Sequence, residues 1–554
     1  MYTSIRALTV GLFSIGCLAA VAEETPPIDV MKVRNGALSV TLRGNSQSPR
    51  ILSGLDSLFH LDKTPDFDAF DPDTPGASAG LNFEHIISGC KNSNNKFTPR
   101  SGNYRLVRDS DGKSGTLVRR SKDSPWKMDS TLTYHVVDPH YIDFEFSCTP
   151  RDASLFGKHG YALLFFANYM NDVSNVALHF RGRTAKDTTD RWVEAAAPPG
   201  HVDWNQGGTY RSFLADELAI DDNVEFRLNT WSYDWPRISK PFYFGRSERG
   251  MAFVLMFDRL YSARDQIRFS LFKFKVPKHP RPAWDFQYVI NQVQTDQTYG
   301  FRGRMVWKPF VSAEDCEDEY KQWRQVTREE RIRELRKRGA SVFSRGKKVV
   351  EVNANGTNLT DYELGWLADY EEMTDLSLEG VAISDVGIAQ LVSLKKLEWL
   401  NLYQCPVGNA TLRHLKSLPQ LQHLPIGNSR VTDAGLVHVA AMPQLVYLGL
   451  RGNRISDDGL HQIANLKELK GLHLGETDVT DSGLRNLVGL QKLESLWLDH
   501  TEVSDKGLDT LVELKGLREL HLKNTEVSKQ GIQRLKKKIP RCVINQDNAS
   551  SLRN

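Results

Sequence analysis

Two pairs of nearby side chains in the first half of the sequence are of types that perform acid–base chemistry. Glu84 is followed directly by His85, and His201 stands two residues before Asp203. A carboxylate and an imidazole can both be tuned to exchange protons near neutral pH, so either pair would suit a general acid and base. Neither pair lies in a catalytic motif, and isolated His and Asp residues of β proteins more often form structural hydrogen bonds. The catalytic residues therefore stay unknown, and the sequence favours a non-enzymatic role without deciding it.

Aromatic residues in the same half of the chain are candidates for stacking on sugar rings. Trp231, Tyr233 and Trp235 alternate along the sequence and would share one face of an extended segment, and Trp204 precedes them. Flat apolar rings of this kind suit sugars. Packing in a domain core is the alternative, so these four residues form a candidate sugar platform.

Other chemistry lacks a sequence signature. The sequence contains no glycine-rich phosphate loop, no nucleophile elbow and no zinc-protease motif. Asp66, Asp68, Asp71 and Asp73 fall in one loop without calcium-loop spacing, and a solvated acidic loop is the simpler interpretation. The sequence predicts no metal site and no cofactor. With 71 basic against 68 acidic residues, the formal charge of +3 also predicts no nucleic-acid partner.

The second half of the sequence repeats itself every 24 residues. Within each repeat, apolar residues first alternate and then recur at helical spacing, which predicts one strand and one helix per repeat, stacked into a solenoid. The equivalent leucines are Leu376, Leu400, Leu424, Leu448, Leu472, Leu496 and Leu520.

The junction between strand and helix has its own pattern. A Ser or Thr is placed to cap the helix, an Asp follows in the first turn where the helix dipole favours negative charge, and a Gly comes two residues later. Because glycine is a poor helix former, its recurrence predicts close contact with the adjacent coil. One repeat departs from the pattern with Thr411 at the glycine position, and Pro425 in the next strand cannot donate a ladder hydrogen bond.

These residues resemble the leucine-rich repeat family, in the form L-x-x-L-x-L-x-x-T-x-V-[ST]-D-x-G-L that runs from Leu493 to Leu508. The resemblance covers about 195 residues, from Val350 to Ile544. It implies a curved solenoid whose parallel sheet lines a concave face that usually binds macromolecules. Similar repeats occur in F-box adaptor proteins, but a predicted signal peptide argues against that role here.

The outward positions of the repeat strands flank the buried leucines and can be read from the sequence. Tyr, Trp and Arg anchor many interfaces, so these positions predict a binding face, although stacking within the sheet would also explain them. The candidate binding residues are Trp399, Asn401, Tyr403, His423, Tyr447, Arg451, His473, Trp497 and Asp499.

Composition divides the 554 residues into several segments, which predicts a multidomain protein. Short alternating segments separated by Gly, Pro and Asn predict an all-β sandwich over residues 28–311. Residues 312–348 are highly charged and predict a helical connector. Residues 349–545 form the repeat domain, and residues 546–554 are expected to be a disordered tail.

The length and aromatic strands of the first domain, together with its ending over residues 282–288 and 304–310, are similar to the galactose-mutarotase-like supersandwich of sugar-active proteins. The resemblance implies a carbohydrate-directed role. It carries no short motif, so it assigns none of that family's acid and base residues to this chain.

The first residues indicate export. An apolar run from Ala7 to Ala22 follows Arg6 and ends in Ala20-Val21-Ala22. The run is short for a spanning helix, and its small residues suit signal peptidase, so residues 1–22 are a predicted signal peptide cleaved after Ala22. Lipid attachment at Cys17 is the alternative. The mature protein is expected to be secreted or periplasmic, with no transmembrane segment.

The remaining cysteines predict neither a zinc site nor a disulfide-rich scaffold, because they are odd in number and widely spaced. Their pairing stays open, with Cys148 interpreted as a small core residue. They are Cys90, Cys148, Cys316, Cys405 and Cys542.

Together these features predict a secreted recognition protein. Its repeat face would bind an extracytoplasmic protein or polysaccharide, and its sandwich is a candidate for carbohydrate binding. The alternative is a carbohydrate-active enzyme (epimerase, lyase or hydrolase) with the repeats as a targeting module. A carboxylate converging with a His in an aromatic cleft of the first domain would favour the enzyme. The sequence leaves the ligand and the oligomeric state open.

Overall fold

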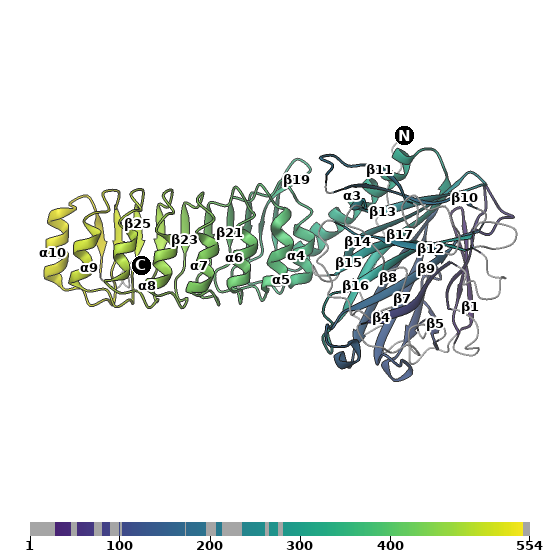
Figure 1. Ribbon diagram of the computed structural model, residues 1–554, viewed down its shortest axis with the longest axis horizontal. Coiled ribbons are helices and arrows are strands. Elements are labelled where there is room, and N and C mark those ends of the chain that lie inside the picture. Colours follow the sequence, from purple (N-terminus) through teal and green to yellow (C-terminus); the bar gives the residue numbers. More distant parts are fainter. Residues whose placement is uncertain are drawn as a thin grey trace. The chain divides into compact units, whose positions relative to one another are not determined.

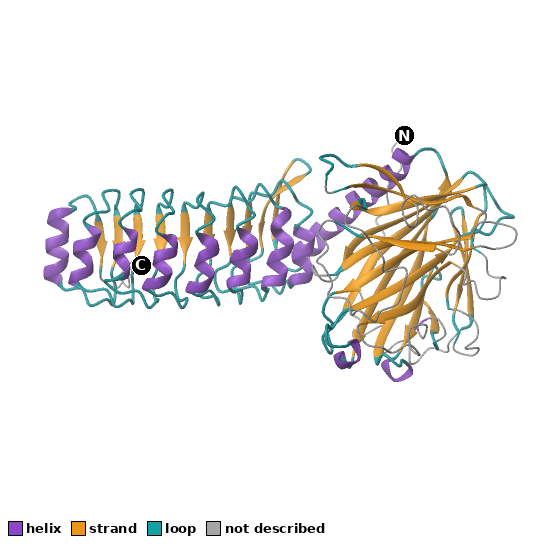
Figure 2. Cartoon of the chain, viewed as in Figure 1, coloured by secondary structure: helices purple, strands orange, loops and turns teal. Residues whose placement is uncertain are grey.

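The computed structural model describes residues 28–45, 53–70, 80–88, 99, 102–171, 173–184, 186–195, 206–212, 235–260, 265–274 and 281–546. The chain forms two compact units, residues 1–324 and 325–554. The first is built almost wholly of strands, whereas the second alternates strands with helices (Figure 1, Figure 2). No helix in the described ranges is long and apolar enough to cross a membrane. The predicted signal peptide lies outside these ranges.

The described residues of the first unit form three antiparallel sheets. The smallest joins β1 (Val30–Asn35), β2 (Leu38–Arg43) and β3 (Gly54–His60). A nine-stranded sheet has the order β11 (Arg191–Ala195), β10 (Val173–Arg183), β13 (Arg237–Ser247), β14 (Met251–Leu260), β17 (Tyr299–Pro309), β8 (Tyr141–Pro150), β7 (Met128–Val137), β6 (Ser114–Arg119) and β5 (Arg105–Arg108). A five-stranded sheet has the order β12 (Gln206–Tyr210), β15 (Gln266–Phe274), β16 (Arg281–Ile290), β9 (Ala162–Tyr169) and β4 (Gly80–Ser88). Two short 3₁₀ helices, η1 (Ser121–Asp123) and η2 (Ala153–Phe156), complete the described elements.

Alternating side chains of the nine- and five-stranded sheets meet in one aromatic core. The rings of Phe146 and Phe166 lie 4.9 Å apart, and those of Phe257 and Phe286 lie 4.7 Å apart, in each case with one ring from each sheet. The opposite face of the five-stranded sheet is different, because buried polar side chains occupy much of it.

The predicted charged connector is helical only in part. Helix α3 spans Ala313–Lys337, and Gly339 ends it with a φ of 94°. The next residues form an antiparallel hairpin of β18 (Ser341–Arg345) and β19 (Lys348–Asn353), so the predicted connector includes a strand. Val342 and Val349 explain this, because both are buried in the core of the repeats.

The second unit has one ten-stranded sheet whose strands pair in sequence order from β18 to β27. From β19 onward the pairing is parallel, and each equivalent leucine lies opposite the next, as Leu448 lies opposite Leu472. The remaining strands are β20 (Asp375–Ser377), β21 (Trp399–Asn401), β22 (His423–Pro425), β23 (Tyr447–Gly449), β24 (Gly471–His473), β25 (Ser495–Trp497), β26 (Glu519–His521) and β27 (Val543–Asn545).

A helix follows each strand from β20 to β26, and a further helix follows β19, so the repeat prediction holds at the level of single elements. The helices are α4 (Asp361–Leu367), α5 (Asp385–Ala389) with η4 (Gln390–Ser393), α6 (Asn409–Leu415), α7 (Asp433–Val439), α8 (Asp457–Ile463), η5 (Gly483–Leu487), α9 (Asp505–Leu511) and α10 (Lys529–Lys538).

The Asp of each helix start links neighbouring coils. The carboxylate of Asp457 accepts the backbone N–H and the hydroxyl of Thr480, the cap position of the next coil, at 2.8 and 2.7 Å. A Cβ at Gly483 would lie 2.1 Å from Asp457 Oδ1. The predicted close contact at the glycine is therefore confirmed, and its cause is the Asp of the preceding coil.

The repeat that has Thr411 at the glycine position keeps this contact, because two of its residues have swapped types. Gly408 replaces the capping Ser or Thr, and Thr411 replaces the glycine. Asp385 then accepts the N–H of Gly408 at 2.8 Å and the hydroxyl of Thr411 at 2.6 Å. One predicted cap is wrong, because the Thr432 side chain makes no capping bond and instead accepts one from Asn409. Pro425 reduces the pairing of β21 with β22 to Trp399 opposite His423.

Candidate functional site

The predicted binding residues occupy three rows across one face of the ten-stranded sheet, opposite the buried leucines. We call this face the open face. Trp399, His423 and Tyr447 belong to the first row, and Asn401, His473 and Trp497 to the second. Tyr403, Arg451 and Asp499 come two residues after the second row in their repeats. All nine residues therefore share one face, but they do not form one cluster.

Four rings gather over β23 to β26, and we call Tyr447, His473, Trp497 and His521 the aromatic cluster. The His473 and Trp497 rings stack with centroids 5.5 Å apart and planes within 10°. His521 stacks on Trp497 at 5.5 Å and 25°, and Tyr447 meets Trp497 edge-on at 6.2 Å. Each ring is partly exposed. The cluster is thus a continuous aromatic surface with defined ring geometry.

Two glycines make room for the cluster. A Cβ at Gly471 would lie 2.7 Å from Tyr447 Cδ2, and a Cβ at Gly475 would lie 2.9 Å from His473 Cε1. The ring of Tyr447 thus occupies space that a side chain on β24 would fill. This arrangement indicates that the rings are held in place before any ligand arrives.

An ion pair borders the aromatic cluster. Arg451 Nη2 lies 2.6 Å from Glu476 Oε1, and this hydrogen bond lowers the pKa of Glu476. Burial, together with the Arg451 charge, lowers the pKa of His473 to about 4. The Nδ1 atom of His473 accepts the N–H of Gly475 at 3.2 Å, so the neutral ring carries its proton on Nε2.

The open face before β23 has a different character. Asn401 is buried, and its Nδ2 donates to Ser377 Oγ at 3.2 Å and to Glu379 Oε2 at 3.1 Å, while its Oδ1 accepts the N–H of Tyr403. The Tyr403 hydroxyl accepts a bond from Asn428 at 2.8 Å. The hydrogen bonds of the Asn401 side chain therefore lie within the repeat domain itself.

Sequence reasoning left Glu476, Gly471 and Glu519 out of the candidate site. Glu476 has a φ of 59° in the turn after β24, outside the alternating strand positions. Glu519 Oε1 accepts a hydrogen bond from His521 Nε2 at 2.8 Å. The 24-residue period places Gly471 and Glu519 in the row of Trp399 and Tyr447, so that period was the available signal.

In the first unit, Glu84 and His85 belong to a buried polar group on the five-stranded sheet. His85 Nδ1 lies 3.1 Å from Glu84 Oε2, and the Tyr169 hydroxyl donates to Glu84 Oε1 at 2.8 Å. The His85 ring stacks on Phe165 at 4.4 Å. Burial and the Glu84 charge raise the pKa of Asp285 well above its usual range. Two carboxyls, an imidazole and a phenol therefore converge here.

Of the candidate sugar platform, the structure describes only Trp235. Trp235 packs its ring 5.3 Å from Tyr210, beside the core. Trp204, Trp231, Tyr233, His201 and Asp203 lie outside the described residues, as do Asp71, Asp73 and Cys90. Four cysteines are buried free thiols, namely Cys148, Cys316, Cys405 and Cys542.

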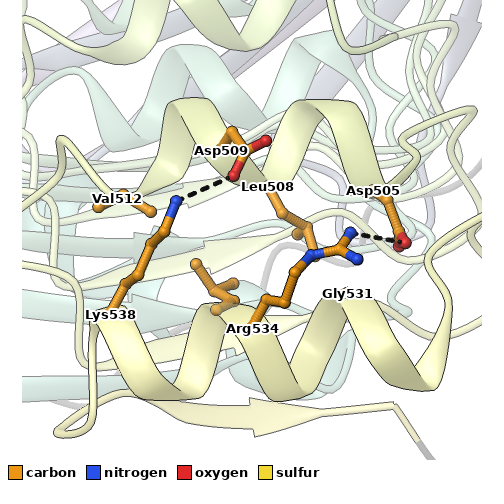
Figure 3. Close-up of a pocket in the computed structure, with 8 residues that line it drawn as sticks. Asp505, Leu508, Asp509, Val512, Gly531, Arg534 and Lys538 are labelled. Atoms are coloured by element: carbon orange, nitrogen blue, oxygen red, sulfur yellow. Dashed lines mark hydrogen bonds and ion pairs between the residues drawn. The ribbon is translucent and has the colours of Figure 1, made fainter.

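A groove between α9 and α10 offers no room for a ligand. Arg534 pairs with Asp505 at 3.0 Å, and Lys538 pairs with Asp509 at 3.2 Å, so two ion pairs bridge the helices (Figure 3). The groove is part of the packing of the last coil.

No family model and no curated protein matches this chain. Among solved structures, it is similar to the leucine-rich repeat ectodomain of the receptor kinase GASSHO1/SCHENGEN3 from Arabidopsis thaliana, in complex with CASPARIAN STRIP INTEGRITY FACTOR 2. That match has a TM-score of 0.26 and 15% identity, over 36% of this chain and 24% of the other. The leucine-rich repeat ectodomain of the Arabidopsis receptor kinase HAESA, in complex with an IDA peptide hormone, matches with a TM-score of 0.26 and 13% identity. That match covers 33% of this chain and 40% of the other.

An internalin from Listeria monocytogenes matches with a TM-score of 0.19 and 14% identity, over 40% of this chain and 95% of that one. The chain thus spans less than half the length of both plant ectodomains.

Proposed function

We propose that the second unit is a leucine-rich repeat recognition module that binds a macromolecular ligand on its open face, at the aromatic cluster. The stacked and partly exposed rings of Tyr447, His473, Trp497 and His521 carry this proposal. Tyr and Trp provide large contact areas that lose little side-chain entropy on binding, and rings already in place lose less.

The size of the cluster supports a chain-like ligand. Adjacent strands lie about 4.8 Å apart, so the step from β23 to β26 spans about 14 Å. That length corresponds to about four residues of an extended polypeptide, each adding about 3.4 Å. A small metabolite would cover only part of it.

The test uses full-length protein and two probe collections, a displayed library of random dodecapeptides and a glycan array. Binders recovered with the parent chain are measured again with Trp497→Ala and with Gln462→Ala on the exposed face of α8. Trp497→Ala should cost about 2 kcal/mol or more in binding, because it removes the centre of the cluster, whereas Gln462→Ala should cost almost nothing. Equal binding by all three proteins would place the ligand elsewhere.

A second candidate function belongs to the first unit, which we propose to be a sandwich similar to the galactose-mutarotase-like supersandwich. Glu84 and His85 supply the paired carboxylate and imidazole that would favour a carbohydrate-active enzyme, and both side chains are buried. The same contacts also suit a structural hydrogen-bond network. The test measures the activity of the parent and of Glu84→Gln on a panel of oligosaccharides. Activity that vanishes in the variant while the unfolding midpoint stays unchanged would support catalysis. A lowered unfolding midpoint without any oligosaccharide activity in the parent would support a structural role.

We also propose that the protein is exported, with residues 1–22 as the signal peptide. Sequencing the N-terminus of the secreted protein tests this proposal. A mature chain beginning at Glu23 would support it, and a chain retaining Met1 would contradict it.

A further inference from the structure

The orientation of the stacked rings determines which part of them a ligand can reach. His473, Trp497 and His521 stand on adjacent strands at equivalent positions, so the stacking direction runs across the sheet. The two His rings cover both faces of Trp497. The ring edges therefore point away from the sheet, whereas a sugar ring would need an open face.

The rings themselves carry hydrogen-bond donors. The neutral His473 ring carries its proton on Nε2, because Nδ1 accepts from Gly475. The Trp497 indole has only a donor. The nearby carboxylates already accept bonds from the chain itself, Asp499 from the N–H of Lys523 at 2.9 Å and Glu519 from His521. A complementary ligand would therefore offer acceptors, such as the carbonyl oxygens of an extended peptide.

Arg451 adds a positive charge between aromatic walls. Gly427 and Gly475 stand at the position of Arg451 in the preceding and the following repeat. A Cβ built at Gly427 would lie 3.1 Å from the Tyr403 ring, and one built at Gly475 would lie 2.9 Å from the His473 ring. The guanidinium has five N–H groups, and its described hydrogen bond, to Glu476, uses one of them. Its side chain is 44% exposed, which leaves the others within reach of a ligand.

We infer that the ligand is an extended polypeptide segment with an acidic side chain, whose carboxylate binds Arg451 and whose carbonyl oxygens bind the donor edges of His473 and Trp497. The inference rests on the proposed function and names its ligand class. Arginine suits this role because its planar fork can donate two parallel hydrogen bonds to one carboxylate.

The experiment sequences the dodecapeptides selected by the full-length protein and measures one labelled peptide against variants. Selected peptides should be enriched in Asp and Glu. Arg451→Glu should weaken binding about tenfold or more, and replacing the peptide's acidic residue by Lys should restore binding to that variant. The matched control is Arg454→Glu, the same charge change at an exposed position of the same repeat, and it should leave binding unchanged.

The possible results separate this inference from the proposed function. Peptides that lose binding with Trp497→Ala but show no acidic enrichment and ignore Arg451→Glu would refute the acidic ligand while leaving the cluster as the site. Binding only to the glycan array would refute the polypeptide class. Peptides indifferent to Trp497→Ala would refute the proposed function itself.

Discussion

The hydrogen bonds between polar groups join residues at different separations along the chain in the two units. In the second unit, the carboxylate of Asp433, Asp457 or Asp481 bonds the cap residue 23 positions later. In the first unit, the Tyr169 hydroxyl reaches Glu84 across 85 positions, and Asp285 accepts the N–H of Asn168 across 117. A contact that recurs at one short sequence separation can be predicted from the sequence. Contacts at large and irregular separations cannot.

The largest expected effect comes from breaking a coil-to-coil contact. Gly483→Val should reduce the free energy of unfolding of the second unit by about 3 kcal/mol, because the new side chain collides with Asp457 and displaces its bonds to Thr480. Urea unfolding of the full chain measures this. Gly489→Ala is the control, since its Cβ would meet chiefly the flexible end of Lys467, and it should change stability little. Equal losses in both variants would mean that the Asp contact is not the reason for the glycine.

A second prediction concerns a buried acid of the first unit. Burial raises the pKa of Asp265 to about 8, and its carboxyl accepts a bond from the Tyr288 hydroxyl. The folded state therefore keeps a proton that the unfolded state has lost above about pH 4, so this group's stabilisation falls as pH rises. Between pH 6 and 8 the loss should be about 2 kcal/mol.

Asp265→Asn should remove that part of the pH dependence, because the amide oxygen can still accept from Tyr288 and does not ionise. Urea unfolding at several pH values, followed by the fluorescence of the first unit, makes the comparison. Identical pH profiles for parent and variant would contradict the assignment.

The third prediction isolates the Asp link itself. Asp457→Ala should cost about 1 to 2 kcal/mol, because the N–H and hydroxyl of Thr480 lose their acceptor. Asp457→Asn should be nearly neutral, since Asn409 occupies the same position and bonds Thr432 through both ends of its amide. If the Asn variant is as unstable as the Ala variant, the charge rather than the bonding pattern matters.

The smallest effect concerns Gly408 and Thr411, the two residues whose types are swapped in the irregular repeat. Thr411→Gly should cost about 1 kcal/mol by removing the hydroxyl bonded to Asp385. Adding Gly408→Ser should recover most of that loss, because the serine hydroxyl would take the usual place. A double variant whose effect equals the sum of the two single effects would show that the residues are independent.

Much of the second unit could be predicted from the sequence. The 24-residue period predicts which leucines lie opposite one another, where the helices fall and which face carries Trp497. It can do so because each coil contacts only its neighbours. It did not reveal that His rings cover both faces of Trp497, or that Asn401 is tied to Ser377 and Glu379, because rotamers and hydrogen bonds depend on the side chains of adjacent coils. The polar group around Glu84 was beyond prediction, since strand pairing across the first unit brings it together.

The link between coils also has a consequence for how this protein can change over generations. Each 24-residue repeat before the last brings its own Asp or Asn for the coil after it and its own small residue for the coil before it. The exchanged repeat still accepts Asp385 on one side and offers Asn409 to Thr432 on the other. Duplicating or deleting a whole unit would therefore join compatible surfaces at the new boundary, so the number of coils can vary while the contact between them stays the same.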